Sequence, residues 1–255
     1  MPLVLRAVSG LPDHQDAYGH MVWDHLQGAD TREVIEREDG YIDVSMGAKA
    51  YFAPVRRWFR HERTASRQAR GRVLDVGAGA GRVALYLQER GHDVVAADIS
   101  PLAVETCTAR GVRDARVLAA TELSRNTVGD VDTIVMFGNN FGLFADERRA
   151  RWLLGRFAAM TGPDGRILAT TRDVYGTDNP DHLQYIRANK RRGRMGGQIR
   201  LRVRYRTYTT PWFDYLMVSR AELERILRPT RWRLERTIDE EGPEYVAVIG
   251  KEPAA

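Results

Sequence analysis

The sequence predicts an α/β fold, doubly wound, in which a mostly parallel sheet is covered by helices on both faces. From residue 72 onward, short apolar runs alternate with stretches of helical periodicity. Two of these runs end in an aspartate, and glycines on alternate positions follow the first. Such alternation of strand and helix builds parallel sheets. With 255 residues, 43% of them hydrophobic, the chain can form one large core.

The first strand and its loop are residues 73–81, Val-Leu-Asp-Val-Gly-Ala-Gly-Ala-Gly. The apolar run indicates a buried strand, and the glycines indicate a tight turn whose backbone can approach a ligand. A helix is expected over residues 80–90. A dinucleotide fingerprint needs glycine at the sixth place, which is Arg82 here. The loop therefore predicts a nucleotide-type ligand without a pyrophosphate.

The second strand, residues 93–98, ends in Asp98, roughly twenty positions after the first glycine. At this distance the second strand of such a unit delivers a carboxylate to a ribose, whose two hydroxyls can both donate to it. Ser100 and Pro101 have the pattern of an N-cap and a first helical residue, and Gly111 would end that helix.

The rest of the chain continues the same pattern. The further expected strands are residues 115–120, 132–138, 166–171, 232–238 and 245–249. A capping box at Ser219 and Glu222 predicts a helix that ends at Leu227. The short link between the last two strands predicts that they are antiparallel.

Asp75 two residues before the first glycine, and glycine at the fifth place of the motif, resemble motif I of the class I S-adenosylmethionine-dependent methyltransferases. The resemblance covers about residues 71–251. It implies a seven-stranded doubly wound sheet whose last two strands form an antiparallel hairpin. It also implies S-adenosyl-L-methionine as cofactor and methyl transfer to oxygen or nitrogen of a small-molecule acceptor.

The resemblance assigns roles to the residues around the loop. Asp75 would hold the methionine ammonium, Asp98 the ribose, and Ile99 would pack on the adenine. Where many relatives have an aspartate against the adenine amino group, this chain has Ala119, so Glu122 or a backbone carbonyl would take over. The implied cofactor-binding residues are Asp75, Gly77, Ala78, Gly79, Gly81, Asp98, Ile99, Glu122, Gly138 and Asn139.

Methyl transfer from a sulfonium needs no nucleophilic side chain, because the donor is already activated and the protein mainly positions the acceptor. A hydroxyl acceptor would benefit from a general base. Asp173, just beyond the fifth strand, and His182 are the candidates, although either is also compatible with an ordinary loop role. Catechol-type members of the family have acidic metal ligands at the ends of the fourth and fifth strands. Here the fourth strand ends in Gly138 and Asn139, so the resemblance implies no metal.

Two segments lie outside the expected core. Residues 1–70 are predicted to form an N-terminal helical cover, part of an active-site lid, with a long helix over 49–70. Residues 172–218 interrupt the methyltransferase domain of residues 71–251 as a β-hairpin insertion after the fifth strand. In the family, such additions cover the active site and select the substrate.

The hairpin has one cationic face. Its arginines are Arg200, Arg202, Arg204 and Arg206. Apolar residues alternate with them, and residues 212–218 are expected to pair with this strand. The face is compatible with salt bridges, with a subunit contact in a homodimer, or with a surface for phosphates. An RNA or protein methyltransferase therefore stays open, although nucleic acid is less favoured, as does a protein that binds the cofactor without methylating.

Composition sets outer limits. The net charge is +5, but nearly all basic residues are arginine, which is weak evidence for a polyanionic partner. No apolar run approaches twenty residues, so no membrane partner is expected. The N-terminus lacks a secretory pattern, which predicts a cytoplasmic protein. A single cysteine, Cys107, excludes an internal disulfide framework and a cluster for radical chemistry.

Overall fold

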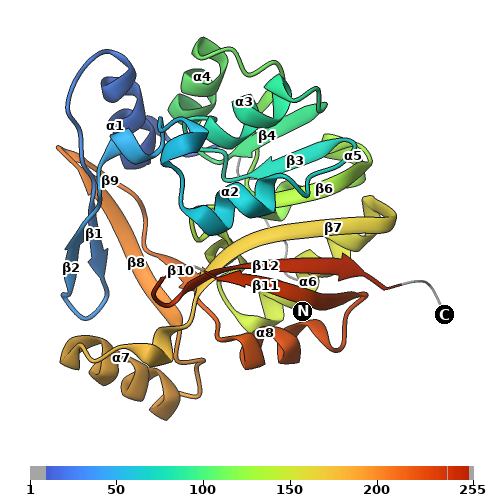
Figure 1. Cartoon of the computed structure of the whole chain (residues 1–255). Helices are drawn as coiled ribbons and strands as arrows, with labels where there is room; N and C mark the ends of the chain where they lie inside the picture. Colours follow the sequence, from blue (N-terminus) through green and yellow to red (C-terminus); the bar gives the residue numbers. More distant parts are fainter. Residues whose placement is uncertain (1–9, 240, 253–255) are drawn as a thin grey trace.

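A computed structural model of the chain describes residues 10–239 and 241–252, which form two β-sheets and the helices around them (Figure 1). Residues 1–9 of the expected N-terminal cover lie outside the described part. The larger sheet has seven strands in the order β11-β12-β7-β6-β3-β4-β5. Within the described residues, no helix combines the length and the apolar character that crossing a membrane requires.

The seven-stranded sheet confirms the predicted fold class. Its strands are β3 (Val73–Val76), β4 (Val94–Asp98), β5 (Ala115–Val117), β6 (Val131–Met136), β7 (Thr161–Arg172), β11 (Trp232–Asp239) and β12 (Glu244–Lys251). β3 to β7 are parallel, while β12 is antiparallel to both β7 and β11. β3 and β4 are buried along their whole length, as expected of central strands with helices on both faces.

Local signals explain where the core helices begin. These helices are α3 (Arg82–Glu89), α4 (Pro101–Ala109), α5 (Arg125–Val128), α6 (Glu147–Ala159) and α8 (Arg220–Leu227). The Ser100 hydroxyl accepts the Ala103 amide at the start of α4, and Ser219 and Glu222 form the expected capping box of α8. Phe157 from α6 packs against one face of the sheet, and Leu87 from α3 packs against the other.

The second sheet joins the two additions to each other. Its strands are β1 (Val34–Arg37), β2 (Ile42–Val44), β8 (Gln198–Tyr205) and β10 (Phe213–Leu216), in the order β10-β8-β1-β2, with β9 (Tyr208–Thr209) also paired to β8. The expected pairing within the insertion is confirmed, since Phe213 lies opposite Leu201. β1 pairs with the other edge of β8, with Glu36 opposite Arg202, and no sequence pattern predicts this pairing.

The prediction of one long helix over residues 49–70 is wrong. The segment instead contains two 3₁₀ turns, η2 (Ala48–Ala50) and η3 (Val55–Arg57), followed by the short helix α2 (Arg60–Ser66). Pro54 interrupts the helical pattern because proline lacks an amide hydrogen and clashes with the preceding turn. The N-terminal cover thus contains the strands β1 and β2 besides its helices.

Two longer helices were not predicted, α1 (Ala17–Leu26) and α7 (Pro180–Arg191). α7 nevertheless has a start signal in the sequence, because Asn179 caps the helix and proline follows at the first helical position. Figure 1 shows α7 beside the second sheet, away from the core helices. The remaining 3₁₀ turns are η1 (Asp13–Gln15), η4 (Ala120–Glu122), η5 (Asn140–Phe144) and η6 (Val174–Gly176).

Candidate functional site

A large cavity lies between the carboxyl ends of the core strands and the second sheet. Its volume is about 1050 Å³. The predicted site residues that line it are Asp75, Gly77, Ala78, Gly79, Asp98, Ile99, Gly138, Asn139, Asp173 and His182. Its position follows the rule that ligands of open α/β sheets bind outside the carboxyl ends of the strands.

The glycine loop is shaped by close packing. Gly77 and Gly79 have φ angles of +70° and +55°, which other residues rarely adopt. A Cβ atom at Gly77 would lie 2.5 Å from Nδ2 of Asn140, and one at Gly79 would lie 2.4 Å from the Tyr18 hydroxyl. Nδ2 of Asn140 donates hydrogen bonds to the carbonyl oxygens of Val76 and Gly77. The loop backbone is therefore fixed from both sides.

Two predicted residues do not line the cavity. Gly81 is the left-handed N-cap of α3, and a Cβ atom there would lie 2.9 Å from Val112 and 3.0 Å from Cys107. Close packing against Val112 and Cys107 therefore requires a glycine at this position. The carboxylate of Glu122 accepts the Ala119 amide at 2.8 Å and caps η4. Glu122 is thus directed to its own turn rather than to the cavity.

Asp75 presents an unpartnered carboxylate oxygen. The residue is 2% exposed, and its Oδ2 is buried without a hydrogen bond. Burial, assisted by the neighbouring carboxylates of Asp98 and Glu62, raises the pKa of Asp75 to about 7, although Arg82 opposes the shift. A cationic group placed against Oδ2 would supply the missing partner and favour the ionised form. The carboxylate therefore fits the ammonium of an amino-acid moiety.

Asp98 is oriented by the backbone. Its Oδ2 accepts the Gly79 amide and its Oδ1 accepts the Ser100 amide, both at 2.9 Å. Burial raises the pKa of Asp98, and these amides act against that rise. Each carboxylate oxygen can accept a second hydrogen bond, so two ribose hydroxyls can be bound together. Ile99 follows with 36% of its surface exposed, which suits contact with a flat ring.

A buried ion pair under this edge of the sheet was not predicted. Glu62 of α2 accepts the Gly138 amide at 2.7 Å and a guanidinium hydrogen bond from Arg82 at 2.6 Å. The Arg82 guanidinium also lies 4.7 Å from the centre of the Trp58 ring. Glu62 therefore connects α2 to the loops after β3 and β6. No sequence motif identified it, because the pairing joins positions without fixed spacing.

The loop after β6 presents a second unpartnered oxygen. Asn139 has a φ of +64°, and its backbone carbonyl accepts the Tyr215 hydroxyl at 2.5 Å. Its Nδ2 donates to Oε1 of Glu244, and the same oxygen accepts a bond from Arg172 at 2.8 Å. Oδ1 of Asn139 and Nε of Arg172 are buried without partners. A hydrogen-bond acceptor and a cationic donor are thus left unsatisfied in two residues that line the cavity.

The two candidate bases line the same cavity. Oδ1 of Asp173 accepts the Tyr175 amide at 2.9 Å and caps η6. Nδ1 of His182 lies 3.4 Å from the Thr177 hydroxyl, and its ring meets Tyr41 edge-on. Burial, followed by the charges of Arg37 and Arg172, lowers the pKa of His182. The imidazole is therefore mainly neutral at pH 7 and can accept a proton.

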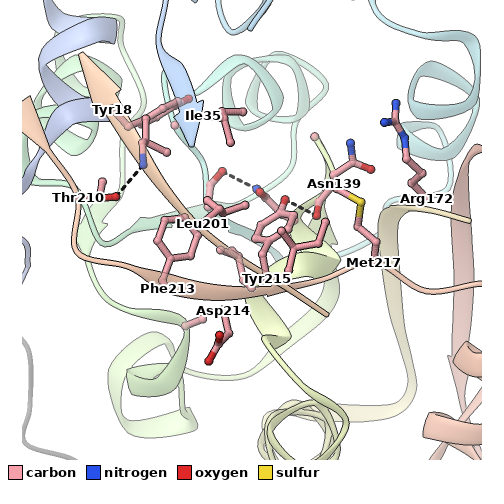
Figure 2. A pocket seen from close by; sticks show the side chains of 18 of the residues that line it. Tyr18, Ile35, Asn139, Arg172, Leu201, Thr210, Phe213, Asp214, Tyr215 and Met217 are labelled. Atoms are coloured by element: carbon pink, nitrogen blue, oxygen red, sulfur yellow. Dashed lines mark hydrogen bonds between the residues drawn. The ribbon is translucent and has the colours of Figure 1, made fainter. Parts of the chain in front are cut away.

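The second sheet forms the roof of the cavity with its apolar face. Ile199, Leu201 and Val203 line the cavity, while the arginines of β8 occupy the alternate positions. The ion pairs of this outer face are Arg200 with Asp214, and Arg202 and Arg204 with Glu36. Arg206, expected on the same strand, instead follows β8 in a turn with a φ of +51°, and it pairs with Asp24. Figure 2 shows the Asp214 carboxylate pointing away from Phe213 and Tyr215. The cationic face is therefore ion-paired and directed away from the cavity.

The family model described as a methyltransferase domain matches residues 73–165. A crystal structure of an S-adenosylmethionine-dependent methyltransferase from Bacteroides fragilis, in complex with S-adenosyl-L-homocysteine, is similar with a TM-score of 0.82 and 28% identity. That match covers 96% of this chain and 98% of the other. The CcbJ methyltransferase from Streptomyces caelestis covers 96% of this chain and 100% of its own at 12% identity, with a TM-score of 0.63, and supports the fold alone.

Among the curated relatives, a glycine/sarcosine N-methyltransferase from Parasynechococcus marenigrum (strain WH8102) is 30% identical over 159 residues. The aligned part is 59% of this chain and 53% of that protein. A glycine/sarcosine N-methyltransferase from Halorhodospira halochloris is 29% identical over 110 residues, 41% of each chain. This chain therefore spans about half the length, or less, of these relatives.

Proposed function

Because this chain belongs to the class I S-adenosylmethionine-dependent methyltransferases, with S-adenosylmethionine as its cofactor, we propose that it transfers the methyl group to a nitrogen atom of a small-molecule acceptor. Sequence alone left oxygen and nitrogen open. The observation that carries the choice is the similarity to relatives named as glycine/sarcosine N-methyltransferases. The unpartnered Oδ1 of Asn139, a residue that lines the cavity, is compatible with it, because Oδ1 can accept a hydrogen bond from an N–H.

The cofactor fits the loop end of the cavity. In this proposal Asp75 binds its ammonium through Oδ2, Asp98 binds the ribose hydroxyls, and Ile99 contacts the adenine. Bound there, the cofactor supplies a sulfonium methyl group that is already activated for transfer. The protein then has to hold the acceptor in line with that methyl group and exclude water. Residues 10–70 and 172–218 serve as the cover that does so.

The acceptor nitrogen is placed by Asn139. Because Nδ2 of Asn139 donates to Glu244, the amide is oriented with Oδ1 free. An N–H of the acceptor can donate to Oδ1, which fixes the nitrogen and leaves its lone pair for the methyl carbon. An amine that arrives protonated must first lose a proton. His182 is the group that accepts it in this proposal, with Asp173 as the alternative base.

The test is turnover with a defined cofactor-binding variant. Purified protein is incubated with S-adenosylmethionine and amine acceptors, and S-adenosylhomocysteine and the methylated amine are measured by mass spectrometry. Asp98→Ala removes two hydrogen bonds to the ribose, so calorimetry should show about 100-fold weaker binding of S-adenosylhomocysteine. Asp93→Ala, at an exposed ion pair before β4, is the matched control. Equal affinity of Asp98→Ala and wild type would contradict the proposed cofactor site.

A polymer substrate gains no support from the arginine strand. Its charges are paired with Glu36, Asp214 and Asp24, and its cationic face is directed away from the cavity. A small acceptor enclosed beneath the roof is therefore the better-supported substrate.

A further inference from the structure

We infer that the acceptor is an amphipathic amine, with an apolar body larger than glycine or sarcosine that lies against the roof of the second sheet. This inference rests on the proposed function, because it concerns the acceptor half of the same cavity. Three properties of that half carry it: its size, the chemistry of its walls, and the balance of its charges.

The cavity is larger than the cofactor and glycine require. Sites for one drug-sized ligand measure roughly 300–1000 Å³, and this cavity measures about 1050 Å³. The cofactor is itself drug-sized and is assigned to the loop end, near Asp75 and Asp98. The lining continues from there under β1, β8 and β10 as far as Tyr185 and Ile186 on α7. The remaining volume suits a second molecule well beyond the size of an unbranched amino acid.

The walls of the acceptor half are mostly apolar. The roof side chains that line it are Ile35, Ile199, Leu201, Val203, Phe213, Tyr215 and Met217. Figure 2 shows Leu201, Phe213, Tyr215 and Met217 gathered in the pocket, with Ile35 above them in this view. Glycine would leave these surfaces in contact with water and gain nothing from them. An apolar or aromatic body removes them from water, which is the main source of affinity in such pockets.

The charges of the lining favour a cationic acceptor. Three lining arginines are each paired with a carboxylate outside the lining: Arg37 with Asp39, Arg82 with Glu62, and Arg172 with Glu244. Asp43, Asp173 and Asp178 also line the cavity, and none has an ion pair within the described residues. Arg149 lines it without such a pair too, so carboxylates predominate among the unpaired charges. Opposite charge raises the local concentration of an amine substrate.

A panel of acceptors tests this inference. Glycine, sarcosine, phenethylamine, N-methylphenethylamine and tryptamine are compared by release of S-adenosylhomocysteine under identical conditions. 3-Phenylpropionate, which has the apolar body and lacks the amine, is the negative control. We expect kcat/KM for the best aromatic amine to exceed that for glycine and sarcosine by at least about tenfold, as a few methylene groups in an apolar pocket would give.

Variants of β8 locate the effect. Leu201→Ala should lower kcat/KM for aromatic amines about tenfold, while its affinity for S-adenosylhomocysteine stays near that of wild type. Arg200→Ala truncates the neighbouring position on the outer face and should leave both quantities near wild type. Val203→Phe fills the acceptor half and should disfavour aromatic amines relative to sarcosine. Calorimetry with S-adenosylhomocysteine also shows that each variant is folded.

The outcomes separate this inference from the proposed function. If wild type does not bind S-adenosylhomocysteine, the proposed function itself fails. If it binds the cofactor product but uses glycine or sarcosine as well as the aromatic amines, the inference is overturned and the methyltransferase assignment stands. Turnover of none of the amines, or an equal loss for glycine and aromatic amines in Leu201→Ala, overturns it as well.

Discussion

The two ends of the cavity are built in different ways. At the end proposed for the cofactor, the lining comes from a backbone loop and from Asp75, Asp98 and Ile99, all within residues 73–99. At the end proposed for the acceptor, it comes from side chains on β1, β8 and β10, which belong to segments far apart in the chain. Substitutions at the first end should therefore affect every acceptor alike. Substitutions at the second should change which acceptor is used.

The largest effect is expected below the cofactor end, at the buried ion pair of Glu62 and Arg82. Their side chains are 2% and 15% exposed. Glu62→Ala leaves the Arg82 charge without its partner and the Gly138 amide without an acceptor. We expect the free energy of unfolding to fall by about 3–5 kcal/mol, measured by urea denaturation.

Asp130→Ala is the control for that measurement, because it breaks an exposed pair with Arg125. Its effect on stability should be too small to resolve. A loss for Glu62→Ala no greater than that of the control would show that the pair does not hold the two loops together.

The next effect concerns pH at the cofactor end. The pKa of Asp75 is raised to about 7 in the ligand-free protein, and binding of an ammonium needs the ionised carboxylate. Affinity for S-adenosylhomocysteine should fall about tenfold between pH 8 and pH 6, with proton release on binding near pH 7. Calorimetry in buffers of different ionisation enthalpy measures both, and Asp75→Asn should remove the pH dependence.

The raised pKa of Asp75 also predicts how its contribution to folding stability changes with pH. Since the folded pKa of Asp75 lies above its unfolded value, its contribution to stability is complete below about pH 4 and is lost as pH rises through 7. Urea denaturation of wild type against Asp75→Asn across this range checks it. A wild-type curve that rises relative to the variant over the same interval would refute the raised pKa.

A smaller effect tests whether β10 positions Asn139. The Tyr215 hydroxyl on β10 donates to the carbonyl of Asn139 at 2.5 Å. Tyr215→Phe removes this bond, worth about 1 kcal/mol, and should lower kcat/KM for the acceptor about fivefold while affinity for S-adenosylhomocysteine hardly changes. Tyr245→Phe loses a similar buried bond, to Val218, outside the cavity. It should reduce stability but leave acceptor kcat/KM unchanged, and equal kinetics in both variants would refute the positioning role.

The smallest effect is expected on the outer face of the roof. Arg204 is half-exposed and shares Glu36 with Arg202. Arg204→Ala should leave kcat/KM within about twofold of wild type, because exposed ion pairs contribute little. Filter binding to a mixed RNA pool should be equally weak for both proteins. RNA binding that weakens steeply with salt and is lost in the variant would instead support a polymer substrate.

The difference between the two ends of the cavity also explains which parts of the site could be predicted from the sequence. The core strands and the loop from Asp75 to Asp98 carry local signals: apolar runs, glycine spacing and helix caps. The pairing of Glu36 with Arg202 has no such signal, because register between distant strands depends on tertiary packing. The same holds for Glu62 and for the orientation of Asn139. Pro54 is different, since it was visible in the sequence and should have ended the long helix that was expected there.

The β1–β8 pairing makes the two additions a single structural unit. If only the 172–218 segment were replaced by that of another enzyme, Val34–Arg37 would pair with a strand whose hydrogen bonds and charges do not match. Replacing both segments together would preserve the pairing between their strands. Changes of substrate by recombination should therefore require exchange of the two segments as a set.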